Sequence, residues 1–288
     1  MTITLLLETS PLAFTIACLI LGLLMGSFLN VVIHRLPIML EREWQAEYAR
    51  FGGELPIAEK YNLVVPRSRC PHCGHAITAL ENIPLLSYAI LRGRCSACHA
   101  RISPSYVVIE AACGLLSAWA AWHFGFSWQA LGALVLSWGL LAISAIDLEK
   151  QLLPDKLTLP LLWLGLLFNL GHVFTDISSA VIGAAAGYLA LWSVYHLFRL
   201  VTGKEGMGYG DFKLLALLGA WFGWQRLPVV IIMSAGVGAV IGLLLLGSKR
   251  LKQGAPMPFG PFLAAAGWIV LFWGAPLSDA YLSFTGLR

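Results

Sequence analysis

Charged side chains are scarce in this sequence. Only 12% of its 288 residues are Asp, Glu, Lys or Arg, while 58% are hydrophobic, and the mean hydropathy is +0.77. Because about 25% of the residues in a soluble globular domain are charged, the composition excludes an ordinary soluble protein. The net charge of +4 is small and does not indicate a nucleic-acid partner. The composition is instead typical of a protein most of whose helices lie in a lipid bilayer.

Polar interruptions divide the chain into long apolar runs. A helix needs about 20 apolar residues to cross the hydrocarbon core. The runs lack the alternation of strands, and an open sheet edge cannot face lipid, so we predict an all-α polytopic membrane protein. About eight transmembrane helices are expected, at 11–33, 106–124, 128–146, 157–173, 178–199, 212–224, 228–247 and 259–281. The sixth run is short and is separated from the next only by the sequence GWQRLP, so seven spans are the alternative.

Positive charges are distributed unevenly between the predicted loops. Loops rich in Lys and Arg stay in the cytoplasm. With eight spans, every basic loop falls on one side, whereas seven spans would put the 249–252 cluster on the other. The sequence therefore favours eight. All Lys and Arg residues except Arg226 and Arg288 lie in the segment 34–105 or in the loops 147–156, 199–213 and 249–252.

The long polar segment 34–105 is the only candidate for a soluble domain. It contains the sequences CPHC and CSAC, which supply four thiols, at Cys70, Cys73, Cys95 and Cys98. Two such turns can hold a tetrahedral Zn²⁺, and disulfides are rare in a reducing cytoplasm. We predict a closed zinc site with four cysteine ligands that helps the domain to fold, because it leaves no open position for a catalytic water. A redox dithiol pair and ordinary free cysteines are the alternatives. A neighbouring histidine, His72, His75 or His99, could also replace a cysteine as a ligand.

Two aspartates lie at the predicted cytoplasmic ends of different spans. Asp147 ends the third run and Asp211 precedes the sixth. Ionisable residues at a membrane helix are expensive and usually functional. Two carboxylates that share a proton can activate a water and protonate a leaving amine, so the pair is a hypothesis for peptide hydrolysis. Alternatively each aspartate only caps a helix, which suits Asp211 but not Asp147, because a carboxylate is disfavoured at a helix C-terminus. For Asp155, an N-cap role is predicted.

Glycines precede the second aspartate in the sequence GMGYGD. Gly206, Gly208 and Gly210 would allow a tight turn and a close approach of the backbone to another chain. An extended substrate can pair with such a segment. Gly208 and Gly210 are therefore candidate substrate-binding residues.

Together these motifs resemble the type IV prepilin peptidases, bacterial inner-membrane aspartic proteases of the GxGD kind. The resemblance implies that Asp147 and Asp211 are the catalytic pair and that the four cysteines bind zinc. It also implies a bifunctional enzyme that cuts the leader from type IV prepilins and type II secretion pseudopilins after a glycine. The enzyme then methylates the new N-terminal residue, using S-adenosylmethionine. The matching segments are GSFLNVVIHRLP at 26–37, CPHC, ENIPLLSY at 81–88, CSAC, AIDLEKQLLPD at 145–155 and GMGYGDFKLLALLGAW at 206–221.

The expected domains are a first span at 1–33, a zinc domain at 34–105 that carries the methyltransferase region, and a seven-helix peptidase domain at 106–288. The polar segment has no nucleotide-binding fingerprint, so no residue is assigned to the methyl donor, although Glu41, Glu43, Gly93 and Arg94 are possible contributors. A membrane GxGD peptidase that cuts other substrates without methylation is the alternative enzyme. A cation transporter is the alternative outside enzymes, and it predicts aspartates near the bilayer midplane.

Overall fold

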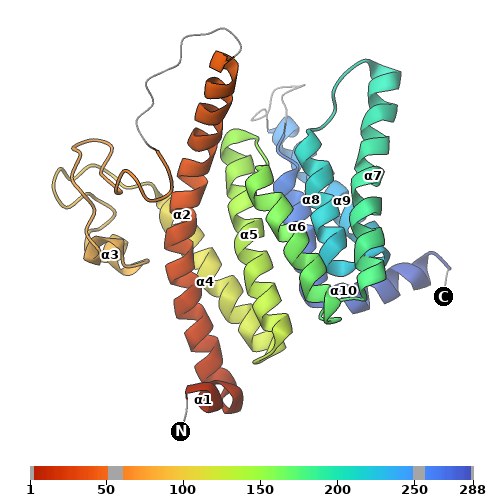
Figure 1. The fold of residues 1–288 in the computed structure, drawn as a ribbon, viewed down its shortest axis with the longest axis horizontal. Helices are drawn as coiled ribbons and strands as arrows, with labels where there is room; N and C mark the ends of the chain where they lie inside the picture. Colours follow the sequence, from red (N-terminus) through yellow and green to blue (C-terminus); the bar gives the residue numbers. More distant parts are fainter. Residues whose placement is uncertain (1–2, 51–60, 249–256, 287–288) are drawn as a thin grey trace. The chain divides into compact units, whose positions relative to one another are not determined.

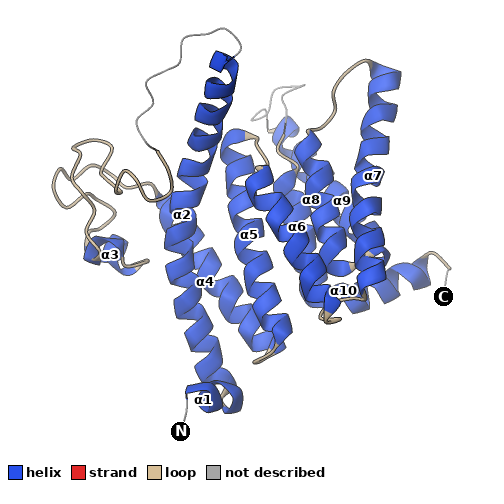
Figure 2. Ribbon diagram, in the orientation of Figure 1, coloured by secondary structure: helices blue, strands red, loops and turns tan. Residues whose placement is uncertain are grey.

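Helices are the regular secondary structure of the part of the chain that the structure describes, with non-helical segments at 61–79 and 91–103 (Figures 1 and 2). That structure is a computed structural model, and it describes residues 3–50, 61–248 and 257–286. Within these ranges there is no strand, only two isolated bridges. The predicted all-α fold is therefore confirmed. The chain forms two compact units, residues 1–130 and 131–288, which are described separately.

The long helices contain most of each predicted apolar run, but the first continues to Arg50, past its predicted end at residue 33. In chain order they are α1 (Ile3–Thr9), α2 (Pro11–Arg50), η1 (Leu80–Asn82), α3 (Leu86–Ile90), α4 (Pro104–Phe124), α5 (Trp128–Lys150), α6 (Asp155–Leu170), α7 (Ile177–Thr202), α8 (Tyr209–Phe222), η2 (Trp224–Arg226), α9 (Leu227–Gly247) and α10 (Gly260–Phe284).

Six helical segments in the described ranges are long and apolar enough to cross a membrane: α2, α4, α5, α7, η2 with α9, and α10. The chain is therefore a multi-pass membrane protein. The other two predicted spans correspond to α6, with 16 residues, and α8, with 14. Both are shorter than the roughly 20 residues that span a bilayer, so the predicted count of eight is approximate.

In the first unit, α2 packs closely against α4. Small residues allow the two backbones to approach: a Cβ added at Gly26 would lie 2.7 Å from the Cα of Glu110. One turn further along α2, Asn30 Nδ2 donates a hydrogen bond of 3.0 Å to the carbonyl oxygen of Tyr106. Beyond this contact, the buried Arg35 donates to the carbonyl oxygens of residues 62 and 63. These bonds fix the polar segment to the helix pair.

The second unit is built around α8. Every residue of α8 from Asp211 to Phe222 is buried except Lys213. Helices α6, α8 and α7 lie side by side (Figure 1), and a Cβ added at Gly187 of α7 would lie 2.6 Å from the carbonyl oxygen of Leu215. At the other end of α8, the buried amide of Asn169 donates to the carbonyl oxygens of residues 220 and 221. A short helix is thus held in place by its neighbours.

Candidate active site

The two aspartates meet within the second unit. Asp147 lies near the end of α5, and Asp211 is the third residue of α8. Their residues are only 5% and 6% exposed, respectively. Leu153 lies against both Gly210, the residue before Asp211, and Gly260, whose backbone N–H binds Asp147. The structure therefore brings together the two acids that the sequence analysis paired.

The N-terminus of α10 holds the carboxylate of Asp147. The backbone N–H of Gly260, the first residue of α10, donates a hydrogen bond of 2.9 Å to Asp147 Oδ2. A Cβ at Gly260 would lie 2.6 Å from the same oxygen, so any side chain there would force the carboxylate of Asp147 or the start of α10 to shift. The positive end of α10 offsets the unfavourable position of Asp147 at the end of its own helix. Sequence reasoning missed Gly260; the signal was the sequence FGPF, with a proline in the first turn of the helix.

Asp211 is held by the start of its own helix. The backbone N–H of Gly208 donates a hydrogen bond of 3.2 Å to Asp211 Oδ2. The other oxygen, Oδ1, is buried and has no hydrogen-bond partner among the described residues. Helix capping therefore accounts for one oxygen of Asp211 and leaves the other for chemistry, because a buried carboxylate oxygen is costly unless it shares a proton or meets a donor.

Leu153, in the loop between α5 and α6, joins the two helix starts. A Cβ added at Gly210 would lie 2.6 Å from the Cβ of Leu153, and one added at Gly260 would lie 3.0 Å from its Cδ2. Leu153 therefore packs on the residue before Asp211 and on the residue that binds Asp147. The sequence analysis did not single out this leucine.

The glycines before Asp211 do not form a turn that only glycine can adopt. None of Gly206, Gly208 and Gly210 has a positive φ among the described residues, so the expected tight turn is not what requires them. Gly210 does approach a neighbour closely, but within the chain, at the side chain of Leu153; a close approach to another chain stays a prediction. Gly208 is extended, with φ −83° and ψ 153°, and an added Cβ there would make only ordinary contacts, the nearest at 3.8 Å from Asp211 Oδ2. The assignment of Gly208 and Gly210 to substrate binding stays a prediction.

Asp155 does not cap its helix. The N-cap of α6 is Pro154, and Asp155 is the first residue of the helix, so the predicted N-cap role is wrong. Both carboxylate oxygens of Asp155 instead accept hydrogen bonds of 2.7 Å from Lys213 Nζ. This ion pair joins the start of α6 to the first turn of α8.

Aromatic rings surround the first turn of α8. The ring of Phe212 lies 5.8 Å from that of Tyr188, 5.6 Å from that of Tyr195 and 5.4 Å from that of Tyr209, measured between centroids. These edge-to-face contacts stabilise the segment that carries Asp211.

In the first unit, the four predicted zinc ligands form one cluster. Tetrahedral Zn–S bonds of about 2.3 Å place the sulfurs roughly 3.8 Å apart. The observed separations are 3.8 Å between Cys70 and Cys98 and 4.0 Å between Cys73 and Cys95, and all four sulfurs lie within 4.8 Å of one another. The donor set and its spacing fit zinc.

The neighbouring histidine has another role. His75 Nε2 lies 3.2 Å from Glu81 Oε1 and 3.3 Å from Ser96 Oγ. The Ser96 hydroxyl and the backbone N–H of Thr78 lower the pKa of Glu81 to about 2. His75, Glu81 and Ser96 thus connect the two cysteine turns, and the metal-ligand cluster in the described residues contains the four cysteines alone.

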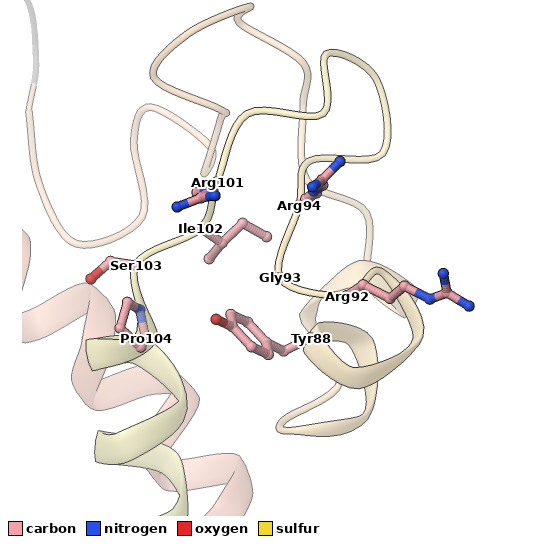
Figure 3. A pocket seen from close by; sticks show the side chains of 8 residues that line it. All are labelled: Tyr88, Arg92, Gly93, Arg94, Arg101, Ile102, Ser103 and Pro104. Carbon is pink, nitrogen blue, oxygen red and sulfur yellow. The ribbon is translucent and has the colours of Figure 1, made fainter.

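Two of the four residues considered for methyl transfer line a cavity. Gly93 and Arg94 border a space of about 550 Å³ at the start of α4, with the ring of Tyr88 pointing into it (Figure 3). Glu41 and Glu43 are exposed residues on α2. No described contact gives any of these four a role with a methyl donor, so none is assigned.

The comparisons with known proteins agree with the site. Residues 20–124 match the bacterial peptidase A24 N-terminal domain, and residues 134–243 match the type IV leader peptidase family. The chain is 60% identical over 284 residues to the prepilin leader peptidase/N-methyltransferase of Stutzerimonas stutzeri, covering 98% of each chain. Its identity to the protein of that name from Pseudomonas aeruginosa is 56%, again over 98% of each, and to that from Aeromonas salmonicida 56%, over 97% of this chain and 99% of the relative. No solved structure shows a significant match. The chain therefore belongs to the type IV leader peptidase family.

Proposed function

We propose that this chain is a bifunctional enzyme of the bacterial inner membrane. It removes the leader from type IV prepilins and type II secretion pseudopilins by cutting after a glycine, and it N-methylates the new N-terminal residue. The observation that carries the peptidase assignment is the pair Asp147 and Asp211, two buried carboxylates from different helices, each held by one backbone N–H. The relatives' names join this activity to methyl transfer.

For peptide hydrolysis, the two aspartates act as a unit that holds one proton. The ionised carboxylate takes a proton from a water molecule. At the same time, the oxygen of that water attacks the carbonyl carbon of the glycine. The protonated carboxyl group donates its proton to the carbonyl oxygen, which gives a tetrahedral diol. The C–N bond then breaks, one diol hydroxyl returns its proton to the pair, and the leaving nitrogen takes a proton from it. The partnerless Oδ1 of Asp211 is the oxygen that we place against the water or the carbonyl.

The distribution of basic residues supports a cytoplasmic position for this chemistry. The C-terminal end of α5 and the start of α8 adjoin loops rich in Lys and Arg, and such loops stay in the cytoplasm. The basic leader of a prepilin stays on the same side, so its cleavage point and the two aspartates lie at a similar depth. A cation transporter would need carboxylates near the midplane, whereas these lie at the ends of their helices.

Methyl transfer converts the new N-terminal amine into a secondary amine. S-adenosylmethionine would supply the methyl group: the N–CH3 bond would form as the S–CH3 bond breaks, which would release S-adenosylhomocysteine, and the proton lost by the nitrogen would pass to water. We place this activity in the zinc domain. Cys70, Cys73, Cys95 and Cys98 would hold a structural Zn²⁺, which closes the two turns and leaves no position for a water.

The peptidase assignment is tested with purified Asp147→Asn and Asp211→Asn variants acting on a purified prepilin. Loss of a catalytic carboxylate should lower kcat by at least about 100-fold. Glu149→Gln is the matched control, because it makes the same charge change on an exposed side chain two residues after Asp147. Normal cleavage by either aspartate variant would show that the two aspartates are not the catalytic pair.

The alternative is a membrane peptidase of other substrates without methyltransferase activity. Mass spectrometry of processed pilin distinguishes the two, because methylation adds about 14 Da to the new N-terminal residue without removing the charge of the amine. Cleaved pilin that never gains this mass in the presence of S-adenosylmethionine would favour the alternative.

A further inference from the structure

A patch of large apolar side chains is exposed on the polar segment of the first unit. Leu80, Ile83, Leu86 and Ile90 are 77%, 38%, 53% and 70% exposed, respectively. Leu80 lies in η1, and Leu86 and Ile90 lie on one face of α3, four residues apart. Exposed apolar clusters of this kind mark contact with a membrane or a protein. These four residues are called the apolar patch below.

A hydrogen bond shows how deep the patch lies along the membrane helices. The backbone N–H of Leu85, the residue before α3, donates a bond of 2.9 Å to Glu110 Oε2. Glu110 is the seventh residue of α4, so it lies roughly 9 Å beyond the start of that helix. Figure 1 accordingly shows α3 alongside the pair α2 and α4, not beyond the start of α4. The apolar patch is therefore level with the first turns of a membrane-spanning helix.

The bond to Glu110 is built into the fold. Glu110 is 9% exposed, and its carboxylate also has a side-chain hydrogen bond with Ser27 of α2. Leu85 adopts φ 59°, which is uncommon for a bulky residue. The bond to a buried carboxylate offsets this backbone strain. The position of α3 is thus fixed by a specific hydrogen bond that offsets backbone strain. A surface loop without a defined position would have no reason to contain such strain.

Basic residues surround the cavity next to the patch. Arg92, Arg94 and Arg101 are exposed and border the cavity of about 550 Å³ at the start of α4. In Figure 3 the guanidinium groups of Arg92 and Arg101 extend to different sides, while Tyr88 and Ile102 point into the space. The apolar patch thus lies level with the first turns of α4 and has arginines beside it. An interfacial membrane anchor has the same arrangement: its apolar side enters the acyl region, and its cations bind lipid phosphates.

We propose that the η1–α3 segment is a membrane anchor: the apolar patch enters the lipid leaflet on the side of the basic loops, and Arg92, Arg94 and Arg101 bind the phosphates of anionic phospholipids. A lipid surface is favoured over a protein partner because the patch lies at the level of α4, where lipid is the solvent, and because the flanking charge is complementary to anionic headgroups.

The test places the photo-crosslinking residue p-benzoylphenylalanine in the full-length chain, in vesicles of equal parts phosphatidylglycerol and phosphatidylcholine. At Ile90 the expected product is a chain that carries one phospholipid. At Ala97, an exposed residue in the second cysteine turn, lipid adducts should be at least about tenfold fewer. Equal labelling at the two positions, or adducts of Ile90 with a second chain or with added prepilin, would overturn the anchor.

The proposed binding of anionic headgroups by the three arginines is tested with a separate variant. Adducts at Ile90 should contain phosphatidylglycerol at least about threefold more often than phosphatidylcholine. The combined Arg92→Gln, Arg94→Gln and Arg101→Gln changes should bring this ratio to about one. A ratio that stays unchanged in the triple variant would show that the arginines do not select the lipid.

A measurement on the unmodified chain covers the case in which the labelled variants do not fold. Hydrogen exchange at residues 83–91 should be at least about threefold slower in phosphatidylglycerol nanodiscs than in phosphatidylcholine nanodiscs. Exchange at residues 70–76, in the first cysteine turn, should be the same in both. Equal exchange at 83–91 in the two lipids would count against the proposal, whatever the result of cleavage assays.

Discussion

At Gly260, the lack of a side chain allows a backbone N–H to reach the carboxylate of Asp147. The hydrogen bond is 2.9 Å long, and a Cβ would lie 2.6 Å from the same oxygen and 3.0 Å from Leu153. Even a methyl group would therefore force the carboxylate of Asp147 or the start of α10 to shift, which disturbs their hydrogen bond. The position of this carboxylate depends on a residue 113 positions away in the chain.

We expect Gly260→Ala to lower kcat for prepilin cleavage. Loss of a hydrogen bond to a charged group costs about 1.5–3 kcal/mol, which corresponds to a rate loss of roughly 10- to 100-fold. Gly236→Ala is the control, because no atom lies within 4 Å of an added Cβ there. Steady-state cleavage assays of both variants give the comparison. Equal kcat values for Gly260→Ala and the control would mean that the bond has no part in positioning Asp147.

The four cysteines lead to a second prediction at the residue scale. A tetrahedral site loses most of its affinity when one ligand is removed, so Cys98→Ser should lower bound zinc from about one ion per chain to less than about a tenth. Cys18→Ala should leave the zinc content unchanged, since Cys18 is buried in α2 and lies outside the cluster. Elemental analysis of the purified proteins measures both. Full zinc in Cys98→Ser would show that another residue, such as His99, completes the site.

At the scale of elements, α7 and α8 are in contact through glycines. A Cβ added at Gly219 of α8 would overlap the carbonyl group of Gly183 of α7. Without a hydrophobic driving force between helices in lipid, such close backbone packing is what holds them together. This contact also sets the position of Asp211, eight residues earlier on the same helix.

Gly219→Ala should therefore destabilise the peptidase unit. Forcing a methyl group into a packed interface costs about 1–3 kcal/mol, which should lower the midpoint of thermal inactivation in detergent by at least about 3 °C. Gly236→Ala again serves as the control. If the two variants lose cleavage activity at the same temperature, α7 and α8 do not depend on this contact.

The helices could be predicted from the sequence, and several contacts could not. Apolar runs predicted the six helices that are long enough to cross a membrane, because burial in lipid requires a continuous apolar stretch whatever its neighbours are. The lengths of α6 and α8 were harder to predict. A helix that is enclosed by other helices, as α8 is, need not be long enough to cross the bilayer. Asp147 and Asp211 stood out because carboxylates are rare in apolar runs. Gly260 and Leu153 did not, because only the folded chain brings them to the aspartates.

At the scale of the whole molecule, the two proposed chemistries are assigned to different units. Asp147 and Asp211 lie in residues 131–288, and the cysteine cluster lies in residues 1–130. Hydrolysis needs a proton-sharing pair, whereas methyl transfer needs an uncharged amine and a bound donor. The backbone N–H groups that hold the two aspartates, those of Gly208 and Gly260, also belong to the second unit.

The last prediction follows from this division. A chain with both Asp147→Asn and Asp211→Asn should fail to cut prepilin, yet it should methylate a pilin supplied with its leader already removed at a rate within about twofold of the unmodified enzyme. Asparagine keeps the shape of aspartate, so the start of α8 and the contact with Gly260 should survive. Mass spectrometry of the supplied pilin measures the methyl group, and Glu149→Gln controls for loss of a charge. If methylation falls in parallel with cleavage, the aspartates serve both reactions, and the two activities belong to one site and not to two units.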